Sequence, residues 1–354
     1  MNKDSKIFVA GHKGMVGSAI LLELKARGYG NILVQDRKSL DLTRQSEVEK
    51  FFEQGKIEYV FLAAARVGGI YANSTYPAEF IYENLSIATN IVHASYKFGV
   101  KKLLNLGSSC IYPKLAPQPI KEEYLLSGPL ESTNEAYAVA KITAIKLCRY
   151  YNQQYGTNFL SVMPTNLYGT HDDHYDLKTS HVLPALIRKF HLAKCLAKSD
   201  YPAIHKDIEL NGHLTNDKYT IGDDNAAKKA LLQLGITADS VTLWGTGLPY
   251  RELLHVDDLA FACVFLMEKY DAKDIGEHIN IGSGKDLTIK ELAELVSPII
   301  GYQGKILWDS SKPDGTPRKF IDSSKIKNLG WEPKIGLKDG IRMVYKEYVR
   351  RGGS

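Results

Sequence analysis

Two short stretches of the chain combine residue types and spacings that can do chemistry together. The first, Gly11-His12-Lys13-Gly14-Met15-Val16-Gly17, follows the apolar run from Ile7 to Ala10. Glycines at a strand-to-helix turn permit the tight turn, let the backbone approach a pyrophosphate, and let the helix pack closely on the strand. The helix N-terminus then holds the anion, so this stretch predicts a dinucleotide site.

The second stretch is Tyr137-Ala138-Val139-Ala140-Lys141. Its Tyr and Lys stand at positions i and i+4, which places both on one face of a helix. An ammonium beside a phenol favours the phenolate and lowers the pKa of the tyrosine. Tyr137 can then exchange a proton with a carbonyl or an alcohol near neutral pH, which is reductase chemistry.

A small hydroxyl residue lies between these two stretches. The apolar run from Lys102 to Leu106 leads into Gly107-Ser108-Ser109. In a doubly wound sheet, the groups that contact ligands follow the carboxyl ends of the parallel strands. We therefore expect Ser108 to donate a hydrogen bond to a substrate oxygen.

Strand-like runs alternate with amphipathic stretches in the first half of the chain. The runs are Lys6 to Ala10, Asn31 to Gln35, Tyr59 to Ala63, Lys102 to Leu106 and Asn158 to Met163. This alternation predicts an α/β fold, a doubly wound parallel Rossmann sheet with helices on both faces. The first helix should begin near Gly14 and end before Gly28. We expect this domain over residues 1–168, with segments returning near 254–282, and a smaller substrate-binding lobe over 169–354.

The segment from about 197 to 240 is interpreted as an insertion, because it is polar and shows little apolar periodicity. The stretch 223–232 within it begins with good N-cap residues and predicts a helix. A surface excursion is the simpler interpretation, and a lid or a dimer-contact arm is the functional one.

Composition narrows the classes of function. A formal charge of +5 over 354 residues, with scattered Lys and Arg, argues against nucleic acid as a partner and is compatible with an anionic small molecule. We expect no membrane-spanning segment and, since no signal-peptide core is visible, a cytoplasmic protein. The four cysteines, Cys110, Cys148, Cys195 and Cys263, show no metal-ligand or disulfide pattern, so no metal site is expected. Cys110 stands apart because it follows Ser108 so closely.

Five motifs together resemble the extended short-chain dehydrogenase/reductases. They are Ala10 to Gly17, Ala63-Ala64-Ala65-Arg66-Val67-Gly68-Gly69-Ile70, Gly107-Ser108-Ser109-Cys110-Ile111-Tyr112-Pro113-Lys114, Met163-Pro164-Thr165-Asn166-Leu167-Tyr168-Gly169, and Ser311 to Lys319. Within that family they are similar to enzymes acting on GDP-linked 4-keto-6-deoxy sugars. The resemblance implies conversion of GDP-4-keto-6-deoxy-D-mannose to GDP-L-fucose, by C3/C5 epimerisation and NADPH-dependent C4 reduction, in a homodimer.

The resemblance also implies roles for catalytic residues. A ketone at C4 acidifies the hydrogens at C3 and C5, and a thiol and an imidazole suit a base and an acid that act on them. Cys110 matches the family's epimerisation base and His181 its acid. Tyr137 would supply the proton to the C4 oxygen, Ser108 would bind that oxygen, and Lys141 would hold the nicotinamide ribose.

The phosphate state of the cofactor depends on three charged residues. Lys13 and Arg37 match family positions that bind the adenosine 2′-phosphate, which favours NADPH. Asp36, beside Arg37, is a residue type that instead accepts hydrogen bonds from a free ribose hydroxyl. The implied cofactor contacts are Gly11, His12, Lys13, Gly14, Met15, Val16, Gly17, Arg37, Asp41, Leu42, Leu106, Gly107, Lys141, Pro164, Asn166, Leu167 and His181.

The substrate would also be held by residues from the second half of the chain. Trp244 is expected to contact the guanosine, and Lys189 stands where an Arg is common in the family, which would replace a bidentate clamp by a point charge. The predicted insertion lies between these two residues and leaves the sugar specificity open. The implied substrate contacts are Asn166, Lys189, Trp244, Arg251, Asp314 and Lys319.

Three other functions remain open. The first is a GDP-6-deoxy-4-keto-heptose epimerase or reductase serving a surface polysaccharide, since relatives in heptose pathways also carry an insertion here. The second is a nucleotide sensor that has lost its chemistry, although Ser108, Tyr137 and Lys141 are all present. The third is an epimerase that oxidises and re-reduces C4 with retained NAD, which would explain Asp36 but not Cys110 with His181.

Overall fold

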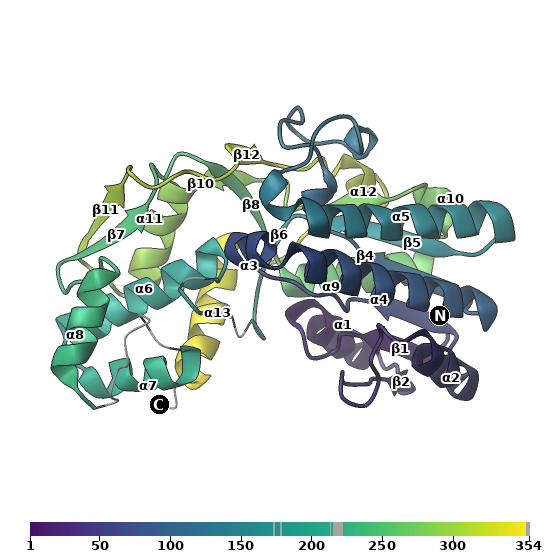
Figure 1. Ribbon diagram of the computed structural model, residues 1–354, viewed down its shortest axis with the longest axis horizontal. Helices are drawn as coiled ribbons and strands as arrows, with labels where there is room; N and C mark the ends of the chain where they lie inside the picture. Colours follow the sequence, from purple (N-terminus) through teal and green to yellow (C-terminus); the bar gives the residue numbers. More distant parts are fainter. Residues whose placement is uncertain (173, 178, 213, 215–221, 352–354) are drawn as a thin grey trace. The chain divides into compact units, whose positions relative to one another are not determined.

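The computed structural model describes residues 1–172, 174–177, 179–212, 214 and 222–351 (Figure 1). It divides into two compact units. Unit 1 comprises 1–167, 252–285 and 320–334, and unit 2 comprises 168–251, 286–319 and 335–354. The returning segment of unit 1 is longer than the expected 254–282, and the segment 320–334 was not predicted.

Unit 1 is built on a six-stranded sheet in the order β2-β1-β3-β4-β5-β9, and every neighbouring pair is parallel. The strands are β1 (Ile7–Ala10), β2 (Ile32–Leu33), β3 (Tyr59–Leu62), β4 (Lys102–Leu106), β5 (Phe159–Pro164) and β9 (Ile279–Ile281). The predicted doubly wound parallel sheet is confirmed. Strand order reverses at β1, between β2 and β3, and ligands bind at such a switch point.

Helices cover both faces of this sheet (Figure 1). One core packs Ile7, Val9 and Leu104 against α1 (Met15–Ala26) and α9 (Val256–Lys269). The other packs Phe8 and Val60 against α2 and α4. Alternate residues of each strand thus enter opposite cores, which explains why the strands are mainly apolar, with Lys102, Asn105 and Ser161 as buried polar exceptions. The remaining helices are α2 (Gln45–Gly55), α3 (Ile70–Thr75), α4 (Pro77–Lys97), α5 (Glu135–Tyr155), α10 (Ala272–Ile275) and α12 (Ser324–Asn328), with short 3₁₀ turns at Ser109–Ile111, Glu122–Tyr124 and Ser132–Asn134.

Unit 2 contains helices packed on short strands. Its helices are α6 (Val182–Ala197), α7 (Tyr201–Asn211), α8 (Asp224–Gln233), α11 (Ile289–Ile300) and α13 (Leu337–Arg351). Its strands are β7 (Ser240–Trp244), β10 (Asp286–Thr288), β11 (Lys305–Asp309) and β12 (Arg318–Lys319). β7 pairs in parallel with β11, whereas β10 and β12 flank β8 (Tyr250–His255), which also pairs with β6 (Asn166–Tyr168). The boundary between the units falls within β6 and β8.

The described residues of the predicted insertion include two helices, α7 and α8. The expected helix at 223–232 is α8, and the Asp223 side chain caps it by accepting from the backbone N–H of Asn225 and Ala226. The helix α7 was missed, and the interpretation as a surface excursion is wrong for it. Arg188 of α6 is fully buried and binds Asp207 of α7 at 2.8 Å. Removing one partner of a buried ion pair costs roughly 3–5 kcal/mol, so α7 is an integral part of unit 2.

No helix among the described residues has the length and apolar character needed to cross a bilayer.

Candidate active site

The glycine turn after β1 has the geometry that a dinucleotide requires. Gly11 has a φ of +85°, and a Cβ there would lie 2.7 Å from the backbone nitrogen of Ala64. A Cβ on Gly17 would lie 2.1 Å from the carbonyl oxygen of Gly11. Both positions therefore require glycine, one for its conformation and the other for close packing of α1 on the turn.

The N-terminus of α1 suits a pyrophosphate. Gly14 is its N-cap and supplies no side-chain hydrogen bond, so the first backbone N–H groups of the helix stay available to an anion. The buried Nδ1 of His12 has no hydrogen-bond partner within the described part of the chain. An uncapped helix start and an unsatisfied buried nitrogen both fit a bound nucleotide.

The charged residues expected to read the adenosine ribose are already paired. Lys13 Nζ lies 3.3 Å from Asp36 Oδ2, and Arg37 Nη2 lies 3.3 Å from Glu83 Oε2. Hydrogen bonds from Ser39 and Lys13 lower the pKa of Asp36 to about 2, so Asp36 is ionised and its charge is offset by Lys13. Both oxygens of Asp36 are engaged within the loop, since Oδ1 accepts from the Ser39 backbone. This engagement weakens the case for Asp36 as a ribose ligand.

Four predicted catalytic residues come together where β4 meets α5. Ser108 caps the 3₁₀ turn after β4, and its Oγ accepts from the backbone N–H of Cys110 at 3.3 Å. The side chains of Ser108 and Tyr137 share a hydrogen bond, and Cys110 is close enough to Tyr137 to affect its pKa. Lys141 Nζ lies 5.8 Å from the centroid of the Tyr137 ring and donates to the carbonyl of Leu106 at 2.7 Å.

The expected lowering of the Tyr137 pKa is wrong for this structure. Burial raises the pKa of Tyr137 well above its ordinary value, Cys110 raises it further, and the hydrogen bond to Ser108 opposes them. Burial also lowers the pKa of Lys141 to about 8, which weakens the charge that was expected to stabilise a phenolate. Tyr137 is therefore a phenol with a proton to give, which suits a reduction.

The loop after β5 is held by a buried glutamate that the sequence reasoning missed. The backbone carbonyl of Glu252 accepts from Asn166 Nδ2 at 3.0 Å. Its fully buried carboxylate accepts from the backbone N–H groups of Gly284 at 2.8 Å and Ile321 at 3.2 Å. These contacts join all three sequence segments of unit 1. The sequence could not predict them, because a single Glu in a strand forms no recognisable sequence pattern.

Three of the remaining residues predicted around the cofactor have contacts within unit 1, one of them local and two with distant segments. The Asp41 carboxylate accepts from the backbone and hydroxyl of Thr43, and the Leu42 carbonyl accepts from Asn90. A Cβ on Gly107 would lie 2.1 Å from the Met163 side chain, so β4 and β5 leave no space there.

Unit 2 brings two of the predicted residues close to each other. His181 is the N-cap of α6. Burial lowers the pKa of His181, the neighbouring charges of His174 and Lys319 lower it further, and Asp172 raises it. Lys319 is thus an electrostatic neighbour of His181. A lowered pKa keeps the imidazole neutral and able to accept or relay a proton at neutral pH.

Other predicted substrate residues of unit 2 have structural partners. Lys189 is largely buried and donates to the carbonyls of Leu234 and Thr242, at 3.5 and 3.2 Å, and burial lowers its pKa to about 8. Arg251 Nη1 donates to the carbonyls of Tyr250 and Thr316. Asp314 accepts from the backbone and hydroxyl of Thr246, whereas Trp244 is 70% exposed. Trp244 is therefore open to a ligand, whereas Lys189 and Arg251 are engaged by backbone carbonyls.

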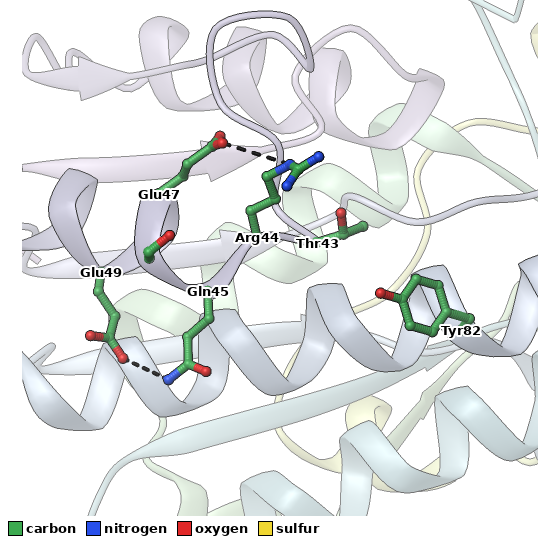
Figure 2. Close-up of a pocket in the computed structure, with 7 residues that line it drawn as sticks. Thr43, Arg44, Gln45, Glu47, Glu49 and Tyr82 are labelled. Atoms are coloured by element: carbon green, nitrogen blue, oxygen red, sulfur yellow. Dashed lines mark hydrogen bonds and ion pairs between the residues drawn. The ribbon is translucent and has the colours of Figure 1, made fainter.

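A separate hollow lies over the start of α2 (Figure 2). Figure 2 shows that its polar groups pair with each other, Arg44 with Glu47 and Gln45 with Glu49, and Tyr82 forms the opposite wall. None of the predicted site residues lines it. The hollow is therefore not the candidate active site.

Comparison with known proteins identifies the family of the chain. A family model described as "NAD dependent epimerase/dehydratase family" matches residues 7–217 and 222–282. "GDP-L-fucose synthase 1" of Arabidopsis thaliana is 52% identical over 99% of this chain and 94% of its own length. "GDP-L-fucose synthase" of Escherichia coli is 44% identical over 97% of this chain and 96% of its own length.

Among solved structures, "MlghC, GDP-mannoheptose C4 reductase from Campylobacter jejuni with NADP bound" has a TM-score of 0.88 and 43% identity, and the match covers 99% of both chains. These matches extend over nearly the whole chain, including the segments that carry the glycine turn and the Ser108, Tyr137 and Lys141 cluster. The chain belongs to the NAD dependent epimerase/dehydratase family.

Proposed function

We propose that the protein converts GDP-4-keto-6-deoxy-D-mannose to GDP-L-fucose, epimerising C3 and C5 and reducing C4 with NADPH. The observation that carries this proposal is a thiol beside the reductase pair: Cys110 lies two residues after Ser108 in the 3₁₀ turn that follows β4, and it is close enough to Tyr137 to affect its pKa. A reductase alone has no use for that thiol. The relatives named GDP-L-fucose synthase support the choice of substrate.

Epimerisation needs one base and one acid. The C4 ketone stabilises an enolate, so Cys110 as thiolate can remove the proton at C3 or C5. His181 then returns a proton to the opposite face of the same carbon, which inverts the centre. His181 must carry a proton before it can deliver one; burial, which lowers its pKa, opposes that protonation, whereas Asp172 favours it.

Reduction uses the hydroxyl groups of Ser108 and Tyr137. NADPH, when bound, supplies the hydride to C4. Ser108 donates a hydrogen bond to the C4 oxygen, and Tyr137 protonates that oxygen as negative charge develops on it. Lys141 would bind the nicotinamide ribose. Burial lowers the pKa of Lys141 to about 8, which weakens its charge but still leaves the ammonium form predominant near Tyr137 at neutral pH.

A heptose substrate is the second candidate function. The GDP-mannoheptose C4 reductase of Campylobacter jejuni matches this chain over 99% of both lengths. Incubating the protein with NADPH and GDP-4-keto-6-deoxymannose in deuterated water tests both functions. The proposal expects an L-configured 6-deoxy product with deuterium at C3 and C5. Reduction without deuterium uptake, or rejection of this substrate in favour of a seven-carbon analogue, would support the heptose enzyme.

Cofactor choice gives a prediction for Arg37. Arg37→Ala should raise the KM for NADPH about tenfold or more, because a hydrogen bond to a charged group contributes roughly 1.5–3 kcal/mol, and should leave the KM for NADH nearly unchanged. Asp36→Ala should have the opposite effect and lower the KM for NADPH relative to the KM for NADH, because it removes a negative charge that repels the 2′-phosphate. Lys38→Ala, which removes a neighbouring exposed cation, is the matched control. Equal effects of Arg37→Ala on both cofactors would show that Arg37 does not read the 2′-phosphate.

The proposal includes a homodimer. The helices α4 and α5 pack together and expose large side chains at helical spacing, namely Tyr82 and Tyr96 on α4 and Val139 and Tyr150 on α5. Such a face suits an isologous contact with a second copy. Sedimentation at micromolar concentration should give twice the chain mass, and Tyr150→Glu should shift it towards the monomer. A monomeric wild-type protein would contradict the homodimer.

A further inference from the structure

One carboxylate in unit 1 binds two arginines from different loops. Glu83 Oε2 lies 3.3 Å from Arg37 Nη2, and Glu83 Oε1 lies 2.6 Å from Arg66 Nη1. Arg37 follows β2, whereas Arg66 follows β3. Glu83 itself lies on α4, so a single side chain links the carboxyl ends of two strands.

The Glu83–Arg66 half of this arrangement is firmly held. The Arg66 backbone exchanges two hydrogen bonds with the buried Asn84, at 2.9 and 3.0 Å. Its guanidinium also binds Glu79 at 2.5 Å and lies 5.4 Å from the Phe80 ring centroid. The Glu83 side chain is only 15% exposed. Arg66 therefore offsets the Glu83 charge and fixes the carboxylate in place.

The contact between Glu83 and Arg37 is less constrained than that between Glu83 and Arg66, because the Arg37 side chain is 69% exposed. A long exposed side chain loses rotamer freedom when a ligand orders it, and that loss weakens binding. The contact with Glu83 uses Nη2 and leaves other guanidinium N–H groups free to donate. An arginine held this way is already partly ordered before a phosphate arrives.

We infer that Glu83 is a positioning residue that orders Arg37 for the 2′-phosphate and so contributes to the preference for NADPH over NADH. The inference rests on the proposed role of Arg37 as the 2′-phosphate ligand. Glu83 would act on the cofactor through Arg37, and Arg66, which Glu83 shares with Glu79, offsets part of the Glu83 charge and so limits its repulsion of the phosphate.

The test is direct cofactor binding, measured by titration calorimetry on the full chain without substrate. Glu83→Gln preserves size and removes the charge that holds Arg37. It should raise the Kd for NADPH about threefold to tenfold, the range for ordering one long side chain, and leave the Kd for NADH within twofold. Glu79→Gln is the matched control, since it removes the other carboxylate on Arg66 without touching Arg37, and it should change neither Kd.

A double-mutant cycle separates positioning from a general structural effect. If Glu83 acts through Arg37, then Glu83→Gln should add nothing to the Arg37→Ala variant. Additive effects, a tighter Kd for NADPH, or an equal loss of NADH binding would each overturn the inference. If Arg37→Ala alone leaves the Kd for NADPH unchanged, the proposed role of Arg37 is wrong. If Arg37→Ala raises that Kd but Glu83→Gln does not, only the positioning role of Glu83 is wrong.

Discussion

Tyr137→Phe should lower the kcat for ketone reduction by about a hundredfold or more, the usual range for loss of a general acid. In the proposed mechanism the phenol is the proton source for the C4 oxygen, and Phe keeps the ring that packs edge-on against Phe80 at 6.4 Å. The substitution leaves Lys141 and the glycine turn, the proposed cofactor ligands, unchanged. NADPH binding should therefore survive, and single-turnover reduction is the measurement.

The same variant provides its own control, because epimerisation does not use Tyr137. With GDP-4-keto-6-deoxymannose in deuterated water and no NADPH, Tyr137→Phe should still exchange deuterium into C3 and C5. A reduction rate near that of the wild type would show that another group protonates the oxygen. Loss of exchange together with reduction would indicate damage to the whole cluster around Ser108.

The parts of the fold with strong local signals were predictable from the sequence. The strands β1, β3, β4 and β5 are mainly apolar because both faces are buried, and each lies within one or two residues of its expected limits. The strand β2 is shorter than expected, with only Ile32–Leu33 paired. The helix α7 was missed because Asp207 in it resembles a surface residue, and only the burial of Arg188 beside it reveals the ion pair.

In the candidate site too, local patterns were predictable from the sequence, whereas effects of burial and contacts between distant segments were not. The Tyr137 and Lys141 spacing indicated a shared helical face, but their pKa values depend on burial, and burial reversed the expected direction for Tyr137. The pairing of Arg37 with Glu83 joins residues from different elements. No local pattern reports such a contact, so the counter-ion of Arg37 appears only in three dimensions.

Cys110→Ser should stop deuterium uptake at C3 and C5, with a loss of about a hundredfold or more in the exchange rate. A thiol reaches the thiolate form near neutral pH, whereas a serine hydroxyl is far too weak an acid to do so. The backbone N–H of Cys110, which donates to Ser108, is kept in the variant. Exchange measured by NMR without NADPH isolates this step from reduction.

The product made by Cys110→Ser with NADPH then shows whether the two activities are separate. Ser108, Tyr137 and Lys141 are unchanged, so the variant should reduce the unepimerised ketone directly and yield a D-configured 6-deoxy sugar. His181→Asn should still permit proton removal but impair proton return, and so leave some exchange. If Cys110→Ser instead forms the normal L-sugar, Cys110 is not the base, and the chain is a 4-reductase whose substrate has already been epimerised.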